Sequence, residues 1–235
     1  MSEQTDLMRV YLVPVGAARY RLYVEVPDDE AAATRTAEPA KGRIGRLLKR
    51  FRATLAEAEA ERLRRERGEA SEGSGIWRAI MRKMAEAIAE QRLLWQLRHQ
   101  TTVELCHPID VDGSTALREV RTDFTREVKK HLRWLIIDTL LVAITGPLLF
   151  LLPGPNIVSW YFTFRAIGHF LSWRGARKGL RDIEWRPHPS APLTDVRQAI
   201  SLPPIARRDK LETISVALGL KHLTGFVERV ASRGA

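Results

Sequence analysis

The sequence predicts an α+β fold that is mainly α-helical and contains a transmembrane hairpin of two helices, and three observations lead to this expectation. Apolar and polar residues alternate near the N-terminus, which is the pattern of a half-buried β-strand. Elsewhere apolar residues recur every three or four positions, the period of an amphipathic helix. Two apolar runs, at 134–152 and 157–173, flank a proline-rich turn in a chain that is otherwise heavily charged.

The first expected element is a β-hairpin within residues 8–26. Two alternating runs lie on either side of Gly16, and a glycine between such runs is a hairpin signal. Pro14 has no backbone N–H, so its strand is expected at a sheet edge or at a bulge. Residues 101–106 are a further strand candidate. Because a two-stranded hairpin is marginally stable alone, we expect this segment to supply a third strand.

Two amphipathic helices are expected between these strand candidates. The segment 41–68 carries apolar residues at helical spacing, with Lys and Arg on the opposite face. The segment 76–99 repeats this spacing after a glycine-rich break. Together with the strands, these helices are expected to form a cytoplasmic α+β part that covers residues 1–112.

A third amphipathic helix begins near residue 113 and continues without a break into the first apolar run. Residues 113–182 are therefore expected to form the membrane part of the chain. The remaining residues, 183–235, are expected to be a proline-rich linker followed by short cytoplasmic helices. One of these helices should end at Gly219, since glycine commonly terminates a helix.

The free energy of insertion is the basis for the transmembrane prediction. Apolar side chains of the first run contribute about −5 kcal/mol, which is enough for insertion unaided. The second run gains about −4 kcal/mol, but Arg165 near its middle costs roughly 2.5–3.5 kcal/mol, so this helix should depend on the first. The alternative is a helical hairpin buried in a soluble bundle, which would need apolar cover on nearly all sides.

Basic residues stand outside both ends of the predicted hairpin, while the loop between its helices is uncharged. The positive-inside rule places both termini in the cytoplasm at a bacterial inner membrane, or on the equivalent side of a mitochondrial inner membrane. The expected partners are membrane lipids and either further copies of the chain or another membrane protein, because two helices cannot enclose a path for potassium ions and protons. The lipid-flanking basic residues are Lys129, Lys130, Arg133, Arg174, Arg177 and Lys178.

Asp138, Arg165 and His169 are the candidate site residues, because ionisable groups at membrane depth usually pair with one another or take part in transport. Measured along each helix from the turn, Asp138 and His169 lie at the same level, while Arg165 lies about 6 Å away with no carboxylate at its own level. Two interpretations stay open: a proton- or cation-linked relay, or an Asp–His pair with one Arg that fixes helix packing. The turn is expected to be structural, with ion coordination as the alternative, and comprises Pro153, Gly154, Pro155 and Asn156.

Composition and motifs exclude several classes of function. No nucleotide-binding loop, zinc-protease motif or serine-hydrolase motif is present, so we expect no enzyme activity, no catalytic residue and no cofactor. Cys106 beside His107 lacks a second pair of ligands, so no metal site is expected. The formal net charge of +10 favours anionic partners, but aromatic residues do not interleave with the basic runs, which argues against nucleic acid. The scattered histidines are expected at the surface: His99, His131, His188 and His222.

Three stretches of the sequence resemble one family: MRVYLVPV with the strand RYRLYVEV, then LCHPID, and finally GPLLFLLPGPNIVSWYFTFRAIGHFLSWRG. In the last, an aromatic–Arg–Ala–x–small–His pattern follows the turn and falls on Phe164, Arg165, Ala166, Gly168 and His169. Over residues 8–26 and about 103–180 the chain resembles the mitochondrial potassium/hydrogen exchange-related family. The resemblance implies a small integral membrane protein that takes part in, or regulates, potassium–proton exchange. The alternative is a membrane-anchored adaptor with no transport activity of its own.

Overall fold

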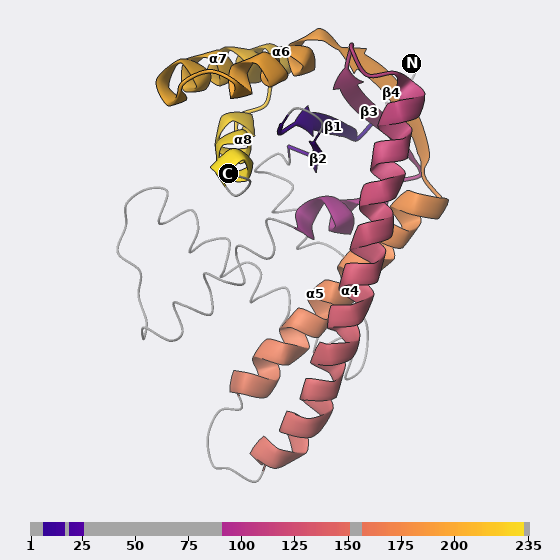
Figure 1. Cartoon of the computed structure of the whole chain (residues 1–235). Coiled ribbons are helices and arrows are strands. Elements are labelled where there is room, and N and C mark those ends of the chain that lie inside the picture. The colour runs from indigo at the N-terminus through magenta and orange to yellow at the C-terminus, as the bar shows by residue number, and fades with distance from the viewer. Residues whose placement is uncertain (1–6, 17–18, 26–90, 151–156, 233–235) are drawn as a thin grey trace, which may run out of the picture. The chain divides into compact units, whose positions relative to one another are not determined.

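The computed structural model describes residues 7–16, 19–25, 91–150 and 157–232, and their side chains except at 147–150, 157–160, 231 and 232. In this part of the chain the fold is mixed α/β, with a four-stranded sheet, helices α4 to α8 and a helical segment at 91–97 (Figure 1). The chain divides into two compact units. One comprises Met1–Glu25, Leu97–Arg126 and Arg177–Ala235, and the other comprises Val26–Gln96 and Glu127–Ala176.

The sheet belongs to the first unit and has the strand order β2-β1-β3-β4. Strands β1 (Arg9–Pro14) and β2 (Tyr20–Tyr23) pair antiparallel and form the predicted hairpin. Strand β3 (Thr102–Pro108) is the predicted third strand, and it lies parallel to β1. Strand β4 (Glu184–Ser190) lies parallel to β3 at the edge of the sheet.

Prolines account for two differences between the predicted and the observed sheet. The expected edge position of Pro14 is wrong, because β1 lies between β2 and β3; Pro14 is tolerated at the end of β1, beyond the residues that pair with β3. The predicted proline-rich linker contains β4, where Pro187 and Pro189 stand opposite Leu105 and His107. Proline is accepted there because the outer N–H groups of an edge strand need no partner. The sheet is thus mixed and four-stranded, which corrects the predicted two or three strands.

Three C-terminal helices share a core with the sheet. Helices α6 (Ala191–Ile200), α7 (Pro204–Leu218) and α8 (Leu223–Ser232) lie together on one side of it in Figure 1. Helix α7 ends at Gly219, whose φ of 69° is the left-handed conformation that glycine adopts without strain, so the predicted end is confirmed. The core cluster comprises Tyr11, Val13, Cys106, Leu193, Val196, Ala199, Leu211, Ile214, Leu220, Leu223 and Val227.

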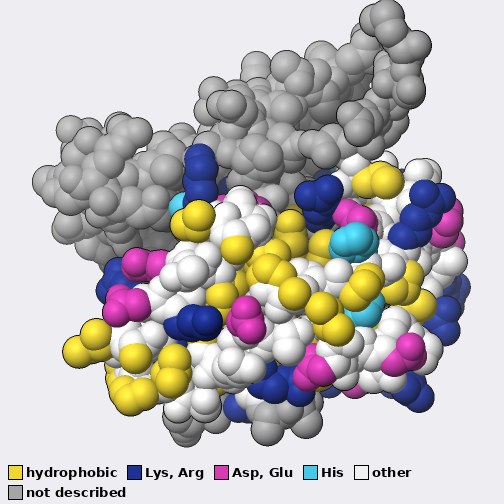
Figure 2. All heavy atoms as spheres, turned by 90° about the horizontal axis from the view of Figure 1, so that it is seen from above, with side chains coloured by type: hydrophobic (Ala, Val, Ile, Leu, Met, Phe, Trp, Pro, Cys, Tyr) yellow, Lys and Arg dark blue, Asp and Glu magenta, His cyan; other side chains and the backbone are white. Residues whose placement is uncertain are grey.

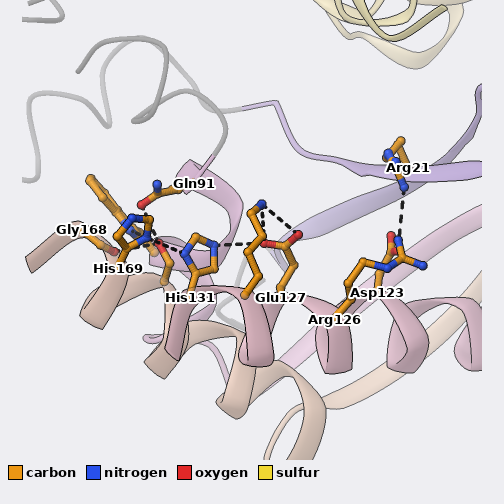
Figure 3. Close-up of polar contacts among 11 residues, drawn as sticks. Arg21, Gln91, Asp123, Arg126, Glu127, His131, Gly168 and His169 are labelled. Atoms are coloured by element: carbon orange, nitrogen blue, oxygen red, sulfur yellow. Dashed lines mark hydrogen bonds and ion pairs between the residues drawn. The ribbon is translucent and has the colours of Figure 1, made fainter. Parts of the chain in front are cut away.

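Helix α4 (Gly113–Phe150) begins in the same unit. Its buried residues there recur every four positions, at Ala116, Val120 and Phe124, which gives this part of the helix one apolar face. On its polar side, Asp123 forms ion pairs with Arg126, at 3.1 Å, and with Arg21 of β2, at 4.0 Å (Figure 3).

The predicted transmembrane hairpin is the main correction. Helices α4 and α5 (Ile157–Arg181) occupy the predicted positions, but no helix in the described part of the chain is long and apolar enough to cross a membrane. Charged residues interrupt the apolar run of α4 at Asp138 and that of α5 at Arg165. The insertion estimate also counted residues 151 and 152, which lie outside the described residues.

Two further predicted elements also fall outside the described residues. They are the basic helix at 41–68 and the turn at 153–156. Of the helix predicted at 76–99, the structure describes only the last part, where residues 91–97 are helical.

Charged side chains of both signs are mixed on the surface. On the face drawn in Figure 2, Lys and Arg side chains lie at several separate places with acidic side chains among them. Two of the surface ion pairs are Arg186–Glu184, at 2.9 Å, and Arg208–Glu212, at 3.2 Å. The described residues of this face therefore do not gather their positive charge into a single basic patch.

Candidate functional site

A group of charged and titratable side chains lies between α4 and α5 within the second unit. We call it the polar cluster: Glu127, His131 and Asp138 on α4, and Arg165 and His169 on α5. The sequence spacing places these groups together, since residues four and seven apart share one face of a helix. Each helix therefore directs its part of the cluster toward the other helix.

The two histidines of the polar cluster contact each other directly. Nδ1 of His131 lies 2.8 Å from Nδ1 of His169, and Nε2 of His131 lies 3.0 Å from Oε2 of Glu127 (Figure 3). A hydrogen bond between two Nδ1 atoms requires one imidazole to carry a proton there and the other to accept it. The contact thus ties the protonation of one ring to the protonation of the other.

Asp138 is fully buried at the end of the cluster. Its Oδ2 lies 3.4 Å from Nε of Arg165 and 3.5 Å from Nε2 of His169, and neither carboxyl oxygen has a hydrogen-bond partner among the described residues. Burial raises the pKa of Asp138, because an ionised carboxylate loses its hydration, and the positive charge of Arg165 opposes this rise only in part. Burial and the charge of Arg165 therefore act on this acid in opposite directions, and burial is the larger effect.

Burial also acts on the other titratable groups. It lowers the pKa of His169 to about 4, and the positive charges of His131, Arg165 and Lys130 add to this effect. Burial alone would raise the pKa of Glu127, but the hydrogen bond from His131 and the charge of Lys130 outweigh it, so that this pKa is lowered. At neutral pH, His169 is thus neutral and Glu127 is ionised.

Aromatic rings hold Arg165 in place. The guanidinium carbon lies 5.4 Å from the ring centroid of Trp134 and 5.7 Å from that of Tyr161, which is the geometry of a cation–π contact. Trp134 also stacks on His169, with the ring centroids 6.3 Å apart. The same aromatic side chain therefore orients both α5 members of the cluster.

The helical segment at 91–97 supports α5 next to the cluster. The Ser172 hydroxyl accepts a hydrogen bond from Nε1 of Trp95 and lies 2.7 Å from Oε1 of Gln91. A Cβ atom added at Gly175 would lie 1.7 Å from the carbonyl oxygen of Leu94, so only glycine permits this approach of the two backbones. The close packing fixes the face of α5 that carries His169.

Comparison with known proteins assigns the chain to a family. Residues 9–181 match the family described as mitochondrial K⁺–H⁺ exchange-related. The chain belongs to this family. The match covers all members of the polar cluster, and it ends at the last residue of α5, before β4 and helices α6 to α8. Neither the curated proteins nor the solved structures contain a match to the chain.

The structure brings together all three of the site residues predicted for this K⁺–H⁺ exchange-related protein. The prediction that Arg165 has no carboxylate partner is wrong, because its long side chain reaches Asp138 from a level one helical turn away.

Among the predicted lipid-flanking residues, Lys130 pairs with Glu127 at 3.2 Å, and Lys178 donates a hydrogen bond to the carbonyl oxygen of Arg98. Four others are exposed: Lys129, Arg133, Arg174 and Arg177.

Sequence reasoning missed two members of the cluster. His131 was expected at the surface, but it is 1 % exposed and lies between Glu127 and His169. A signal was present, since His131 stands four residues after Glu127 and seven before Asp138, on one face of a helix. The neighbouring Lys129 and Lys130 hid this face, because they were interpreted as basic residues that flank a membrane.

The pair Cys106-His107 lies in β3, which belongs to the first unit, whereas the polar cluster belongs to the second. Both side chains are buried, and Nδ1 of His107 lies 2.9 Å from the carbonyl oxygen of Pro108. Burial raises the pKa of the Cys106 thiol to about 11, which makes it a poor nucleophile at neutral pH. Within the described ranges, no group of three or more His, Cys, Asp or Glu side chains is placed to hold a metal ion.

Proposed function

We propose that this protein regulates monovalent cation–proton exchange and that the polar cluster is the place where it binds the proton. The observation that carries the proposal is the buried contact of His131 with His169, extended by Asp138. The description of the family supports the link to potassium and proton exchange. The word mitochondrial in the family description agrees with the alternative location predicted from the sequence, the mitochondrial inner membrane. The other predicted location, a bacterial inner membrane, stays a prediction.

Histidine is suited to this role because its unperturbed pKa makes it the side chain that changes charge closest to physiological pH. In the polar cluster two imidazoles and a carboxyl group share one buried space, and burial opposes the charged forms of Asp138 and His169. A change of pH therefore changes the number of protons held between α4 and α5. Such a change alters the contacts of the two helices, which is what a regulatory proton site requires.

The charge of Arg165 argues for a proton rather than a potassium ion as the ligand of the cluster. Its Nε lies 3.4 Å from the Asp138 carboxyl group, which is the oxygen-bearing group at the buried end. A potassium ion at that carboxyl group would stand beside a fixed positive charge, and like charges at this distance repel strongly in a buried environment. Protonation of Asp138 adds no such pair of like charges next to the guanidinium, since it neutralises the carboxylate.

The second candidate function is an adaptor with no transport activity of its own. One observation favours it: apolar residues on α4 are exposed at a spacing of four, which gives one continuous stripe along the helix. The stripe comprises Leu132, Ile136, Leu140 and Ile144, which are 40, 53, 58 and 64 % exposed. An adaptor would use this stripe to bind another protein, and its activity would not depend on the protonation of the polar cluster.

Proton flux in vesicles distinguishes the two functions. Membrane vesicles from cells with and without the gene are loaded with potassium, and a pH-sensitive dye follows the proton flux driven by the potassium gradient. A regulator of exchange should change the pH dependence of this flux, and His169→Gln should abolish the change. His222→Gln, an exposed histidine outside the matched range, is the control. Equal flux with and without the protein at every pH would overturn the proposal.

A further inference from the structure

We infer that Asp138, His169 and His131 form a proton relay, along which one proton moves from the buried Asp138 carboxyl group to His131 beside Glu127. The inference deepens the proposed function, since it names the path of the bound proton. It rests on three consecutive contacts across the α4–α5 interface: His131–Glu127 at 3.0 Å, His131–His169 at 2.8 Å and His169–Asp138 at 3.5 Å.

The Glu127 end of the relay fixes one proton. An ionised carboxylate can only accept hydrogen bonds, so Nε2 of His131, at 3.0 Å from Oε2 of Glu127, must carry a hydrogen and donate it. Nδ1 of His131 is then the atom whose protonation can vary. This atom lies 2.8 Å from Nδ1 of His169, which is a normal hydrogen-bond length. One proton can therefore occupy the space between the two nitrogen atoms.

Two arrangements of the same protons satisfy these contacts. In the first, His169 carries its proton on Nδ1 and donates it to His131, and the unprotonated Nε2 of His169 faces a protonated Asp138. In the second, His131 is protonated on both nitrogens and donates from Nδ1 to His169. Nε2 of His169 then carries a hydrogen and faces an ionised Asp138. Both arrangements hold the same number of protons.

Passage from the first arrangement to the second breaks two bonds and forms two. The O–H bond of Asp138 breaks as an N–H bond forms at Nε2 of His169. The N–H bond at Nδ1 of His169 breaks as an N–H bond forms at Nδ1 of His131. His169 is neutral before and after the passage, so that one positive charge appears on His131 and one negative charge on Asp138. No other reactant is consumed or released.

The surrounding groups act on the two arrangements in opposite directions. The first avoids a buried carboxylate, which is costly in the absence of hydrogen bonds. The second pairs ionised Asp138 with Arg165 and cationic His131 with Glu127. Lys130, which pairs with Glu127, opposes a positive charge on His169. From the other side, the segment at 91–97 presents Gln91 and Trp95 to α5, both without charge.

The exposure of these side chains fits a path that starts in the buried interior at Asp138 and ends beside the partly exposed carboxylate of Glu127. The side chains of Glu127 and Arg165 are each 29 % exposed, whereas Asp138 is fully buried and His131 is 1 % exposed. The 3.5 Å contact of His169 with Asp138 exceeds a hydrogen bond, so the relay is open at this step. A small rotation of either side chain closes it, and proton-transfer contacts commonly tighten only when the proton moves.

Nuclear magnetic resonance of the full chain labelled with ¹⁵N-histidine tests the relay without any measurement of transport. A scalar coupling between Nδ1 of His131 and Nδ1 of His169 across the hydrogen bond is expected in the wild type. Asp138→Asn removes the carboxylate that the second arrangement needs, so the protonated fraction of His131 Nδ1, read from its ¹⁵N shift, should fall. The matched control Asp209→Asn, at an exposed aspartate of α7, should leave that fraction unchanged.

The same substitution in a second variant, His169→Phe, separates a relay from a general effect of charge. Phenylalanine cannot pass a proton from Asp138 to His131. In His169→Phe, adding Asp138→Asn should therefore no longer change the ¹⁵N shift of His131. The inference is overturned by the absence of the coupling in the wild type, by an unchanged His131 shift in Asp138→Asn, or by an equal change when His169 is phenylalanine. The wild-type coupling decides the matter if a variant fails to fold. An unchanged proton flux together with a positive coupling would reject the proposed function and keep the relay.

Discussion

Asp138 is a carboxyl group without exposed surface and without a hydrogen-bond donor among the described residues, and Arg165 is its counter-charge. A buried charge that loses its partner is strongly unfavourable, whereas a neutral acid in the same place is tolerated. At the scale of single residues, the protonation of Asp138 is therefore controlled by the position of one guanidinium group. Trp134 and Tyr161 set that position.

Arg165→Leu should destabilise the protein by about 1–3 kcal/mol at neutral pH, because it leaves Asp138 without its counter-charge. The loss should shrink at acid pH, where Asp138 is neutral. Urea unfolding at pH 7 and pH 4 measures both values. Arg133→Leu, at an exposed position of α4, is the control and should stay within about 0.5 kcal/mol of the wild type. Equal stability of the two variants at pH 7 would show that the Arg165–Asp138 pair is not needed.

His169 should make the protein sensitive to acid. Its pKa in the folded chain is about 4, below the value near 6.5 of an unfolded chain, so the unfolded chain binds more protons between these pH values. Stability should accordingly fall as the pH drops from about 6.5 to about 4, by up to about 3 kcal/mol. Asp138 acts in the opposite direction, since its raised pKa favours the folded chain at acid pH.

The change His169→Gln separates these two effects. It removes the histidine contribution and leaves that of Asp138, so the free energy of unfolding should fall less between pH 6.5 and pH 4 than it does in the wild type. Urea unfolding across this pH range is the measurement, with His222→Gln as the control. The same fall in the wild type and in His169→Gln would rule out His169 as the acid-sensitive group.

At the scale of elements, two glycines of α5 have different roles although both lie near the polar cluster. A Cβ atom at Gly175 would meet the backbone of Leu94 at 1.7 Å, whereas one at Gly168 would lie 3.4 Å from the Gln91 side chain, an ordinary contact. The family-like pattern of the sequence includes Gly168, yet the packing of the segment at 91–97 depends on Gly175. A pattern of residue types does not reveal such a backbone contact, because the two segments are far apart in the sequence.

Gly175→Ala should therefore destabilise the protein by about 2 kcal/mol or more, since the segment at 91–97 must move away from α5. Gly168→Ala should be neutral or stabilising, because alanine favours a helix by about 1 kcal/mol over glycine. Thermal unfolding compares the two variants, and amide hydrogen exchange of residues 91–97 locates the change. Similar melting temperatures of the two variants would contradict the close contact at Leu94.

Elements with a clear local pattern could be predicted from the sequence. Strand β1 is a short run of apolar and aromatic residues, β2 alternates apolar and polar residues after it, and Gly219 marks the end of α7. Strand β4 could not be predicted, because its prolines are tolerated only on an edge strand, and edge position depends on the whole sheet. The transmembrane prediction weighed the apolar side chains of the two runs against the cost of Arg165, but no helix of the described residues is long and apolar enough to cross a membrane.

At the scale of the whole molecule, the sheet and its helices form one unit and the polar cluster belongs to the other. Helices α4 and α5 each contribute residues to both units. The three predicted site residues were found from the sequence because ionisable groups stand out in an apolar run. The fourth and fifth, His131 and Glu127, were not, because they lie where the helix is already rich in charge.

The central claim is that proton binding at the polar cluster controls potassium–proton exchange. It is tested most directly by potassium-driven proton flux, measured in vesicles at a series of pH values with the wild type, Asp138→Asn and His169→Gln, and with Asp209→Asn as the control. The pH dependence of the flux should be the same in the wild type and in Asp209→Asn. It should be lost in Asp138→Asn and in His169→Gln. A flux whose pH dependence is identical in all four proteins would contradict the central claim.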